Sequence, residues 1–276
     1  MDHVKIEGEK MVKHNRLQHK NVIITGASSG VGLALAEKCA QNGANLVLLA
    51  RRLDVLEKVQ DDLQTRYSAN VKVYKLDVSD TDEIKMVFGQ IVDEINHIDI
   101  LVNNAGYGIF RSAHELSIEE IKRMFQVNVL GLIACTNMVL PLMLKQKQGH
   151  IINIASQAGK IATPKSSAYA ATKHAVLGFT NSLRMEVSDQ NINVTAVNPG
   201  PIETNFFSIA DETGSYVKSV KRFIITPEYV ASKIVNAMLT RTREMNLPRW
   251  MSTGNVLYTL FPRLFEVIGR PFLNKK

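Results

Sequence analysis

Short apolar runs alternate along the chain with stretches whose apolar residues recur every three or four positions. The runs are rich in β-branched residues and predict strands at 21–25, 45–50, 71–78, 98–106, 150–156 and 192–200. The periodic stretches predict helices at 31–44, 51–67, 79–95, 117–144, around Tyr169 and at 226–239. Strands that are apolar throughout and joined by helices are typical of a parallel sheet with helices on both faces. We therefore expect an α/β fold built on one doubly wound sheet.

Polar residues and a proline mark several of the predicted helix starts. Ser79 with Asp82, and Ser117 with Glu120, have the spacing of a capping pair. Pro227 stands at the first position of the last predicted helix, where its missing N–H leaves no hydrogen bond unmade. These signals agree with the boundaries that the apolar pattern indicates.

Composition places the chain among globular proteins. Hydrophobic residues make up 45% of its 276 residues and charged residues 21%, which allows a sizeable core. The net charge of +7 comes from Lys and Arg scattered among Asp and Glu, without aromatic-basic interleaving, so we expect no nucleic acid. Cys39 and Cys135 lie far apart in helical patterns and in no metal-spaced cluster, which indicates free thiols, no metal and a reducing compartment.

The chain shows none of the usual targeting or membrane signals. Residues 1–19 are polar and lack the apolar stretch of a signal peptide, so we expect a flexible N-terminal extension. No uninterrupted apolar run reaches ~18 residues, the length that a membrane-spanning helix needs. The expected location is the cytoplasm.

The candidate functional residues follow the predicted strands, where open parallel sheets bind their ligands. The first strand ends in TGASSGVG (25–32), whose glycines let the backbone approach a pyrophosphate at the N-terminus of the next helix. The spacing G-x-x-x-G-x-G differs from the G-x-G-x-x-G fingerprint, and taken alone the turn fits simple packing equally well. Within a strand–helix–strand unit a dinucleotide is favoured. The expected contacts are Gly26, Ser28, Ser29, Gly30, Val31 and Gly32.

The end of the second strand distinguishes between the two nicotinamide dinucleotides. A carboxylate there would bind both ribose hydroxyls, whereas a guanidinium would bind a 2′-phosphate. The strand runs into Arg51 and Arg52, and the next carboxylate is Asp54. We expect NADP(H) to be favoured over NAD(H); the alternative is two solvated arginines at a helix start.

Tyr169 and Lys173 are four residues apart in SSAYAATKHAVLG, which places both on one face of a helix. Both residue types are common on solvated helix faces, so the pair alone indicates little. A free phenol has a pKa near ~10, and a neighbouring ammonium favours the phenolate and lowers that pKa. The pair is therefore a candidate acid/base.

Read in order, the glycine turn, 103–106 (NNAG), Ser156, Tyr169-x-x-x-Lys173 and Pro199-Gly200 resemble the short-chain dehydrogenase/reductase family over about 20–239. Each motif is weak singly, but the ordered set is specific. The resemblance implies a Rossmann-like domain, here 20–245, that prefers NADP(H). It implies catalytic roles for Asn128, Ser156, Tyr169 and Lys173. The further cofactor contacts that it implies are Tyr169, Lys173, Asp77, Val78, Asn104, Ala105, Gly106, Pro199, Gly200, Ile202 and Thr204.

The roles implied by this resemblance have physical reasons. Tyr169 would be the acid/base, and Lys173 would lower its pKa and hydrogen-bond the nicotinamide ribose. Ser156 would orient the substrate carbonyl for hydride attack. Asn128 would hold a water that links Lys173 to solvent, or satisfy a helix kink locally. Ser29 stands where some NADP-preferring members carry a basic residue, so the cofactor preference rests on the two arginines.

The family places its substrate lid at about 203–225. The aromatic residues expected to form an apolar wall are Phe206, Phe207, Tyr216 and Phe223, with Tyr107 and Phe110 opposite. Core or subunit contacts explain the same aromatics equally well. An apolar ketone, aldehyde or 3-oxoacyl group fits such a wall better than a sugar.

The tail, 246–276, is richer in aromatic and basic residues than the rest and is broken by Pro262, Gly269 and Pro271. It would pack on the body, join an oligomer interface, or lie on an anionic membrane as a basic amphipathic segment. We favour the first two. The resemblance implies homodimers or homotetramers built from the helices around Asn128 and Tyr169.

The leading hypothesis is an NADPH-dependent oxidoreductase that reduces a small-molecule ketone or aldehyde, reversibly, to an alcohol. The alternative is a non-catalytic NADP(H)-binding module that senses redox state or scaffolds a partner. Such modules tend to lose the acid/base residues, whereas this chain has the whole set. A membrane-associated enzyme of lipid metabolism would share the chemistry and differ only in its tail.

Overall fold

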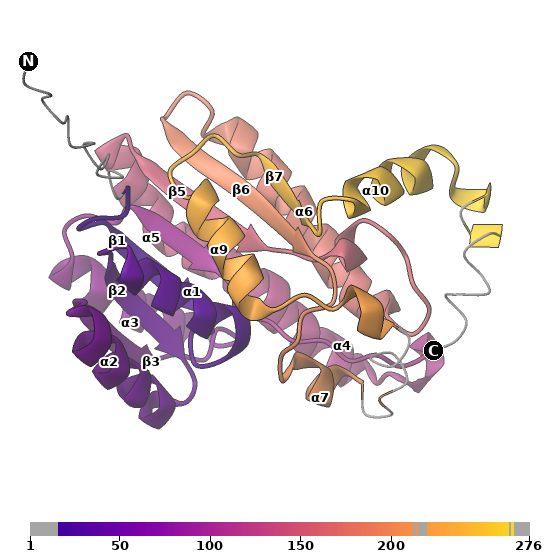
Figure 1. Cartoon of the computed structure of the whole chain (residues 1–276), viewed down its shortest axis with the longest axis horizontal. Helices are drawn as coiled ribbons and strands as arrows, with labels where there is room; N and C mark the ends of the chain where they lie inside the picture. The colour runs from indigo at the N-terminus through magenta and orange to yellow at the C-terminus, as the bar shows by residue number, and fades with distance from the viewer. Residues whose placement is uncertain (1–15, 212–213, 215–219, 265, 268–276) are drawn as a thin grey trace, which may run out of the picture.

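The computed structural model describes residues 16–211, 214, 220–264, 266 and 267, and confirms the α/β fold. In this part of the chain a seven-stranded parallel sheet has the order β3-β2-β1-β4-β5-β6-β7 (Figure 1). Its strands are β1 (Asn21–Thr25), β2 (Asn45–Ala50), β3 (Val71–Lys75), β4 (Ile100–Asn103), β5 (Gly149–Ile154), β6 (Ile192–Pro199) and β7 (Glu244–Leu247). Tyr216, one of the expected wall aromatics, lies outside the described residues.

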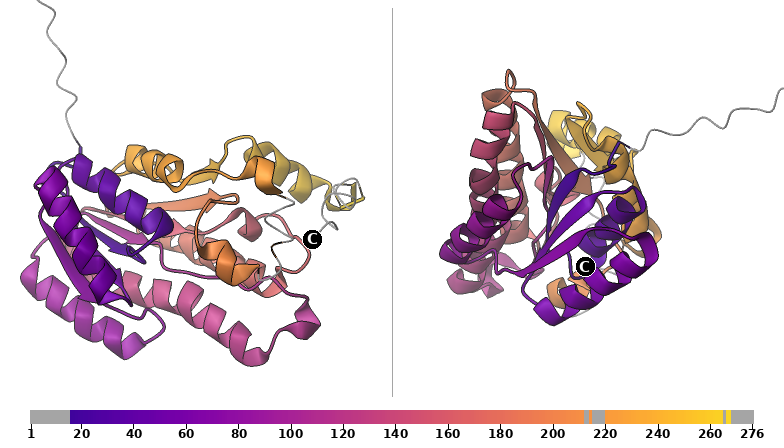
Figure 2. Two further views of the ribbon diagram at one scale, coloured as in Figure 1. Left: turned by 60° about the horizontal axis from the view of Figure 1, so that its bottom comes forward. Right: turned by 90° about the vertical axis from the view of Figure 1, so that its left-hand side faces the viewer.

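Helices cover both faces of the sheet, as expected (Figure 2). One layer contains α1 (Gly30–Gln41), α2 (Leu53–Tyr67) and α9 (Pro227–Ala237). The other contains α3 (Thr81–Glu94), α5 (Leu132–Gln146) and α6 (Ser167–Glu186). Successive residues of β1 face opposite layers, because side chains alternate along a strand: Val22 and Ile24 pack in the first core and Ile23 in the second.

The predicted helix over 117–144 is present but has an irregular centre. Its parts are α4 (Ile118–Phe125), a π-helical turn (Gln126–Gly131) and α5, and the expected capping box of Ser117 and Glu120 starts it. The whole stretch is long and apolar enough to cross a membrane, with 44% of its most apolar window buried in the fold. Because α5 packs on the sheet, it serves here as a layer helix.

The expected capping pair of Ser79 and Asp82 is wrong. Asp80 is the N-cap of α3, and its carboxylate accepts hydrogen bonds from the backbone N–H groups of Asp82 and Glu83. Ser79 instead donates its hydroxyl to Asp77 Oδ1 at 2.7 Å. Aspartate and serine cap helices about equally well, so the sequence alone does not discriminate between neighbours.

β7 was not predicted, because Glu244–Leu247 contains no apolar run. It pairs in parallel with β6 and extends the sheet at that edge. The short helix α7 (Phe206–Ala210) and the C-terminal helix α10 (Met251–Leu260) flank the carboxyl ends of β6 and β7. The strand order reverses between β1 and β4, which places the ligand crevice of such a sheet beside these ends.

Candidate active site

A cleft of about 1750 Å³ lies where the carboxyl ends of the strands meet. It brings together almost all of the residues that the sequence singled out. The expected residues that line it are Gly26, Ser28, Ser29, Gly30, Val31, Arg51, Arg52, Asp77, Val78, Asn104, Ala105, Gly106, Ser156, Tyr169, Lys173, Pro199, Gly200, Ile202 and Thr204. Gly32 and Asn128 lie behind the lining, where each supports it.

The glycine turn between β1 and α1 depends on the absence of side chains. Gly26 has φ +68° and Gly30 has φ +55°, both in the left-handed region that favours glycine. A Cβ on Gly26 would lie 2.9 Å from Ala105 Cα, and one on Gly32 would lie 2.3 Å from Gly26 O. These glycines therefore allow the turn to pack closely on the neighbouring backbone, with the start of α1 lining the cleft where an anion site at a helix N-terminus would lie.

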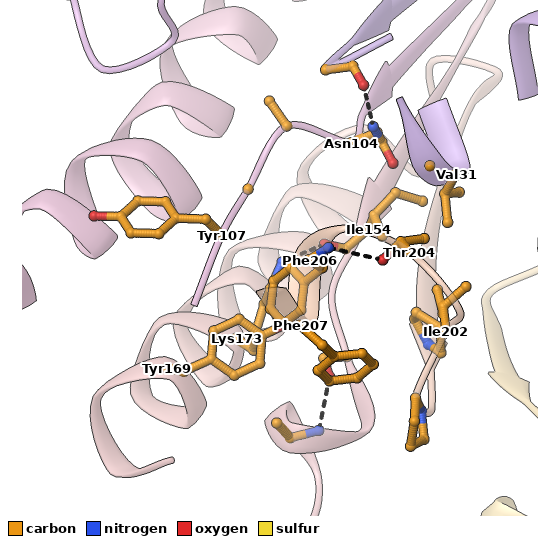
Figure 3. Close-up of a pocket in the computed structure, with 18 of the residues that line it drawn as sticks. Val31, Asn104, Tyr107, Ile154, Tyr169, Lys173, Ile202, Thr204, Phe206 and Phe207 are labelled. Atoms are coloured by element: carbon orange, nitrogen blue, oxygen red, sulfur yellow. Dashed lines mark hydrogen bonds between the residues drawn. The ribbon is translucent and has the colours of Figure 1, made fainter. Parts of the chain in front are cut away.

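Asn104 joins the ends of β1 and β4 beneath this turn (Figure 3). Its Nδ2 donates to Thr25 O at 2.9 Å and to Gly26 O at 3.2 Å. Thr25 Oγ1 in turn accepts from the backbone N–H groups of Asn104 and Ala105, both at 3.0 Å. These bonds hold the glycine turn in position against the neighbouring strand.

Arg51 and Arg52 follow β2 and line the end of the cleft nearest the glycine turn. Arg52 Nη2 donates to Ser28 Oγ at 3.3 Å, which links the arginine pair to the turn. Asp77 lies nearby after β3. Burial alone would raise the pKa of Asp77, but hydrogen bonds from Ser79 and the charges of Arg51 and Arg123 outweigh it and hold that pKa below its usual value. This end of the cleft thus presents ionised groups of both signs.

Lys173 occupies the opposite end, on the inner face of α6. Its Nζ donates to Ile154 O at 2.8 Å and lies 5.8 Å from the centroid of the Tyr169 ring (Figure 3). The side chain is only 5% exposed, and burial lowers the pKa of Lys173 to about 8. The expected proximity of phenol and ammonium on one helix face is present.

Ser156 lies just after β5 and lines the same cleft as Tyr169 and Lys173. Its Oγ accepts a hydrogen bond from Ala158 N at 3.1 Å, in the turn Gln157–Gly159. That bond uses an acceptor site of the hydroxyl and leaves its proton available to a second partner. The turn thus orients Ser156 at the carboxyl end of β5.

Asn128 sits in the π-helical turn and is 1% exposed. Its Oδ1 accepts from Tyr107 N at 3.0 Å, while its Nδ2 donates to Tyr107 O at 2.8 Å and to Thr172 Oγ1 at 3.1 Å. A Cβ on Gly106 would lie 3.1 Å from Asn128 Oδ1 and 3.6 Å from Lys173 Nζ. Asn128 therefore braces the segment after β4 against α6, within a few ångströms of Lys173.

Aromatic side chains form one wall of the cleft around Tyr169. The rings of Phe110 and Phe206 have centroids 5.7 Å and 5.6 Å from that of Tyr169, and Phe207 packs 5.5 Å from Phe206 (Figure 3). Gly108 allows this packing, because a Cβ there would lie 2.8 Å from Tyr169 Cδ2. The expected apolar wall is therefore present only in part: Phe110 packs in the same cluster as Phe206 and Phe207 instead of facing them, and Phe223 packs on Trp250.

The segment after β6 closes the cleft from the other side. Gly200 N donates to Leu247 O at 2.7 Å, and a Cβ on Gly200 would lie 2.9 Å from Met251 Cε. Thr204 Oγ1 accepts from Phe206 N at 3.2 Å, which ties the segment to the aromatic wall. Pro199 to Thr204 is thus held by β7 and α10 as well as by β6.

The structure adds lining residues that the sequence did not indicate. They are Arg123 on α4, Ile161 and Thr163 after β5, Arg222 before α9, and Trp250, Met251 and Gly254 at the start of α10. None of them follows a strand directly, so the expectation that functional residues come just after the strands does not identify them. The aromatic residues of the tail were the one available signal for the α10 group.

The two cysteines are buried and free, as predicted. Burial raises the pKa of both thiols, to about 12 for Cys135, which disfavours the reactive thiolate. Among the described residues, no cluster of His, Cys, Asp and Glu could hold a metal ion.

Comparison with known proteins identifies the family. The model of the short chain dehydrogenase family matches residues 20–215. The chain belongs to that family. A Dictyostelium discoideum protein named dehydrogenase/reductase SDR family protein 7-like is 37% identical, over 92% of this chain and 82% of its own. The NADP-dependent 3-hydroxy acid dehydrogenase of Schizosaccharomyces pombe is 36% identical, over 82% of this chain and 90% of its own.

Solved structures agree with this membership. A short chain dehydrogenase/reductase from Burkholderia phymatum, solved in complex with NAD, matches with a TM-score of 0.82 at 25% identity, over 90% of this chain and 95% of that one. This short chain dehydrogenase is accordingly an oxidoreductase that acts on CH–OH or C=O groups. The family's cofactor is a nicotinamide dinucleotide, and the cleft fits one: the glycine turn at the N-terminus of α1 stands at one end and Tyr169 with Lys173 at the other.

Proposed function

We propose that this short chain dehydrogenase is an NADPH-dependent carbonyl reductase, with Tyr169 as its acid/base. The observation that carries the proposal is the meeting of Ser156, Tyr169 and Lys173 in one cleft that also contains the glycine turn and the arginine pair. Bound NADPH would supply a hydride to the carbonyl carbon of the substrate. Every other part of the reaction falls to side chains of this chain.

The side chains act on the carbonyl oxygen. Ser156 donates a hydrogen bond to it and fixes its position, and Tyr169 donates the hydroxyl proton as negative charge develops there. The Lys173 ammonium stabilises the phenolate that remains, because an opposite charge nearby favours the ionised form. Asn128 acts through the segment around Tyr107 and through Thr172 beside Lys173, so its part is to position these groups.

The Tyr169→Phe variant tests this assignment. It keeps the ring packing against Phe110 and Phe206 but removes the proton donor, so we expect NADPH-dependent ketone reduction to fall ~10²-fold or more. The matched control is Tyr107→Phe, which removes a hydroxyl from another tyrosine of the cleft. A near-normal rate in Tyr169→Phe would exclude the assignment. NADPH binding by the wild type without turnover of any ketone or aldehyde would favour the non-catalytic module instead.

The comparisons do not distinguish between the two cofactors: the yeast relative is named NADP-dependent, and the Burkholderia structure holds NAD. The proposed preference for NADPH therefore depends on Arg51 and Arg52. A guanidinium pairs well with a phosphate, and Ser28 holds Arg52 at the glycine turn. We expect the double variant Arg51→Ala, Arg52→Ala to weaken NADPH binding about tenfold or more, and NADH binding little. Lys58→Ala, which removes an exposed charge from α2, is the control. Equal losses for both cofactors would contradict the preference.

The substrate end of the cleft favours an apolar carbonyl compound. Phe110, Phe206 and Phe207 offer hydrocarbon surface beside Tyr169, which suits an apolar ketone, aldehyde or 3-oxoacyl group better than a sugar. A screen of such carbonyls with NADPH, followed by absorbance, would identify the class. A preference for polyhydroxylated carbonyls would exclude it.

The working form that we propose is a homodimer or homotetramer in a reducing compartment such as the cytoplasm. Ile118, Leu130 and Met185 of the α4–α5 and α6 surfaces are exposed, and apolar side chains on long helices suit contact with a second copy. The free buried thiols fit a reducing environment. Light scattering that reports a monomer would exclude the oligomer.

A further inference from the structure

Helix α10 turns a polar side chain toward the body of the protein and apolar side chains toward the outside. It buries the polar side chain of Asn255, whose Nδ2 donates to Asn246 Oδ1 at 3.3 Å, and turns Val256, Leu257 and Leu260 outward. A surface helix of a globular protein normally places its apolar stripe toward the core. The outward stripe therefore needs a partner other than the body of this protein.

Exposed apolar residues before and after α10 in the sequence make up a tail face together with those of the helix. The residues of this tail face are Trp250, Val256, Leu257, Leu260, Phe261, Leu264 and Val267, each between 49% and 71% exposed. They lie within eighteen consecutive positions: Val256, Leu257 and Leu260 on α10, and the other four before or after this helix. Large contiguous apolar patches on a soluble surface mark contact sites.

Basic side chains accompany the tail face. From Met245 to the end, the sequence has five Lys or Arg residues and a single acidic residue, Glu266. Arg249 and Arg263 are exposed beside the apolar side chains. Arg222 is brought to the same place by its neighbour Phe223, whose ring centroid lies 5.6 Å from that of Trp250. Apolar side chains with a tryptophan and flanking cations are the composition of a helix that lies in an anionic membrane surface.

A second copy of the chain is a weaker candidate for this face. A stable protein interface engages about 20–30 residues on each side, whereas the tail face offers seven apolar side chains. Exposed apolar side chains for subunit contact are present elsewhere, on α4, α5 and α6. Lipid needs no matching surface, because acyl chains adapt to the shape of the helix.

The tail face also adjoins the active-site cleft. Trp250 lies in both, and the cleft lining also includes Met251 and Gly254 of α10 and Phe223 of the turn before α9. Under the proposed function, an apolar carbonyl dissolved in the bilayer would reach Tyr169 past these side chains. This part of the inference rests on the proposed function, whereas membrane contact itself does not.

We propose that the tail face is a membrane-docking surface that lays α10 in the interface of an anionic bilayer, with the cleft opening toward the lipid. Docking places the apolar side chains below the headgroups, and Arg222, Arg249 and Arg263 pair with lipid phosphates. It requires no membrane-spanning segment.

Trp250 reports directly on this surface, because it is the only tryptophan of the chain. We expect its emission to shift to shorter wavelength when the full chain meets vesicles of phosphatidylcholine with phosphatidylserine, and brominated lipid to quench it. The shift should be smaller with phosphatidylcholine alone and should decrease with salt. The double variant Leu257→Ser, Leu260→Ser should partition into vesicles about tenfold less or lower still, since burial of each leucine favours the lipid phase.

Two further variants make the result decisive. Met185→Ser removes an even more exposed apolar side chain from α6 and should bind vesicles as the wild type does. Tyr169→Phe should also bind normally, so loss of the proposed catalytic role and loss of docking are distinguishable. The proposal is overturned if the full chain remains free of vesicles in flotation, or if the leucine variant binds them normally. It is equally overturned if that variant alters only the oligomeric mass, which would assign the face to a second copy.

Discussion

Lys173 combines two properties that conflict in one side chain: it is buried, and the role that we propose for it requires a charge. Burial disfavours the ammonium and lowers the pKa of Lys173 to about 8, while Ile154 O accepts a hydrogen bond from its Nζ. The charged form therefore predominates at neutral pH but is lost within the mildly alkaline range. A weakly held proton close to Tyr169 suits the proposed mechanism, in which the tyrosine must regain a proton after each turnover.

This balance predicts the pH dependence of the reduction. The ammonium is present below about pH 8 and lost above it, so kcat for reduction should fall as the pH rises through that value. Lys173→Arg keeps a positive charge at all these pH values, and its lower activity should persist into the alkaline range. If the steady-state kcat of wild type and of Lys173→Arg falls at the same pH, the fall is caused by the titration of another group.

At the scale of elements, β7 and α10 support the cleft through one side chain. Asn246 Oδ1, on β7, accepts hydrogen bonds from the amides of Gln157, Asn198 and Asn255 at 3.1, 3.1 and 3.3 Å. Gln157 follows the catalytic candidate Ser156, and Asn198 precedes the segment that begins at Pro199. One acceptor thus connects three elements that lie far apart in the sequence.

The Asn246→Ala variant should unfold at lower urea concentration than the wild type. It leaves three largely buried N–H donors without their shared acceptor, and each such loss costs about 1–3 kcal/mol of the free energy of unfolding. Asn70→Ala, at an exposed position before β3, provides the control and should change that free energy little. A stability loss no larger than that of the control would show that the network contributes nothing measurable.

Considering the whole molecule, its tolerance of acid depends on a histidine that joins distant segments. His150 on β5 accepts from Leu239 N at 2.9 Å through Nδ1, and its Nε2 lies 2.8 Å from Thr195 Oγ1 on β6. An N–H donor faces Nδ1, so the folded state holds the neutral ring. Burial lowers the pKa of His150 to about 4, from 6.5 for a free side chain.

Stability should therefore fall as the pH falls from 6.5 to 4, because in that range the unfolded chain binds a proton that the folded chain excludes. The full effect is about 3 kcal/mol in the free energy of unfolding. Urea unfolding at a series of pH values would measure it. His150→Gln should be less stable overall, but its free energy of unfolding should change less steeply with pH. His174→Gln, which alters an exposed histidine of α6, should keep the pH dependence of the wild type. The same pH dependence of stability in all three proteins would show that His150 does not cause the loss of stability in acid.

The predictable part of the fold follows from local patterns. The sequence predicts strands β1 to β6 because a strand covered on both faces of the sheet is apolar throughout. It predicts the layer helices because a helix that buries one face repeats its apolar residues every three or four positions. β7 escaped detection, since an edge strand of four residues needs little apolar surface. The N-cap of α3 was placed one residue early, at Ser79 rather than Asp80, because neighbouring residues competed for one role.

The sequence by itself determined the α/β class, the family and the identity of most residues of the cleft, because each motif combines residue type with a spacing along a single strand–turn–helix unit. Only the tertiary structure decided which groups meet across units: Lys173 with Ile154 O, Phe206 with Tyr169, and Asn246 with three distant amides. It also revealed that α10 faces its leucines outward, which no local pattern could show. The reason is physical: spacing orients side chains within one element, whereas contacts between elements depend on the order and packing of the whole sheet.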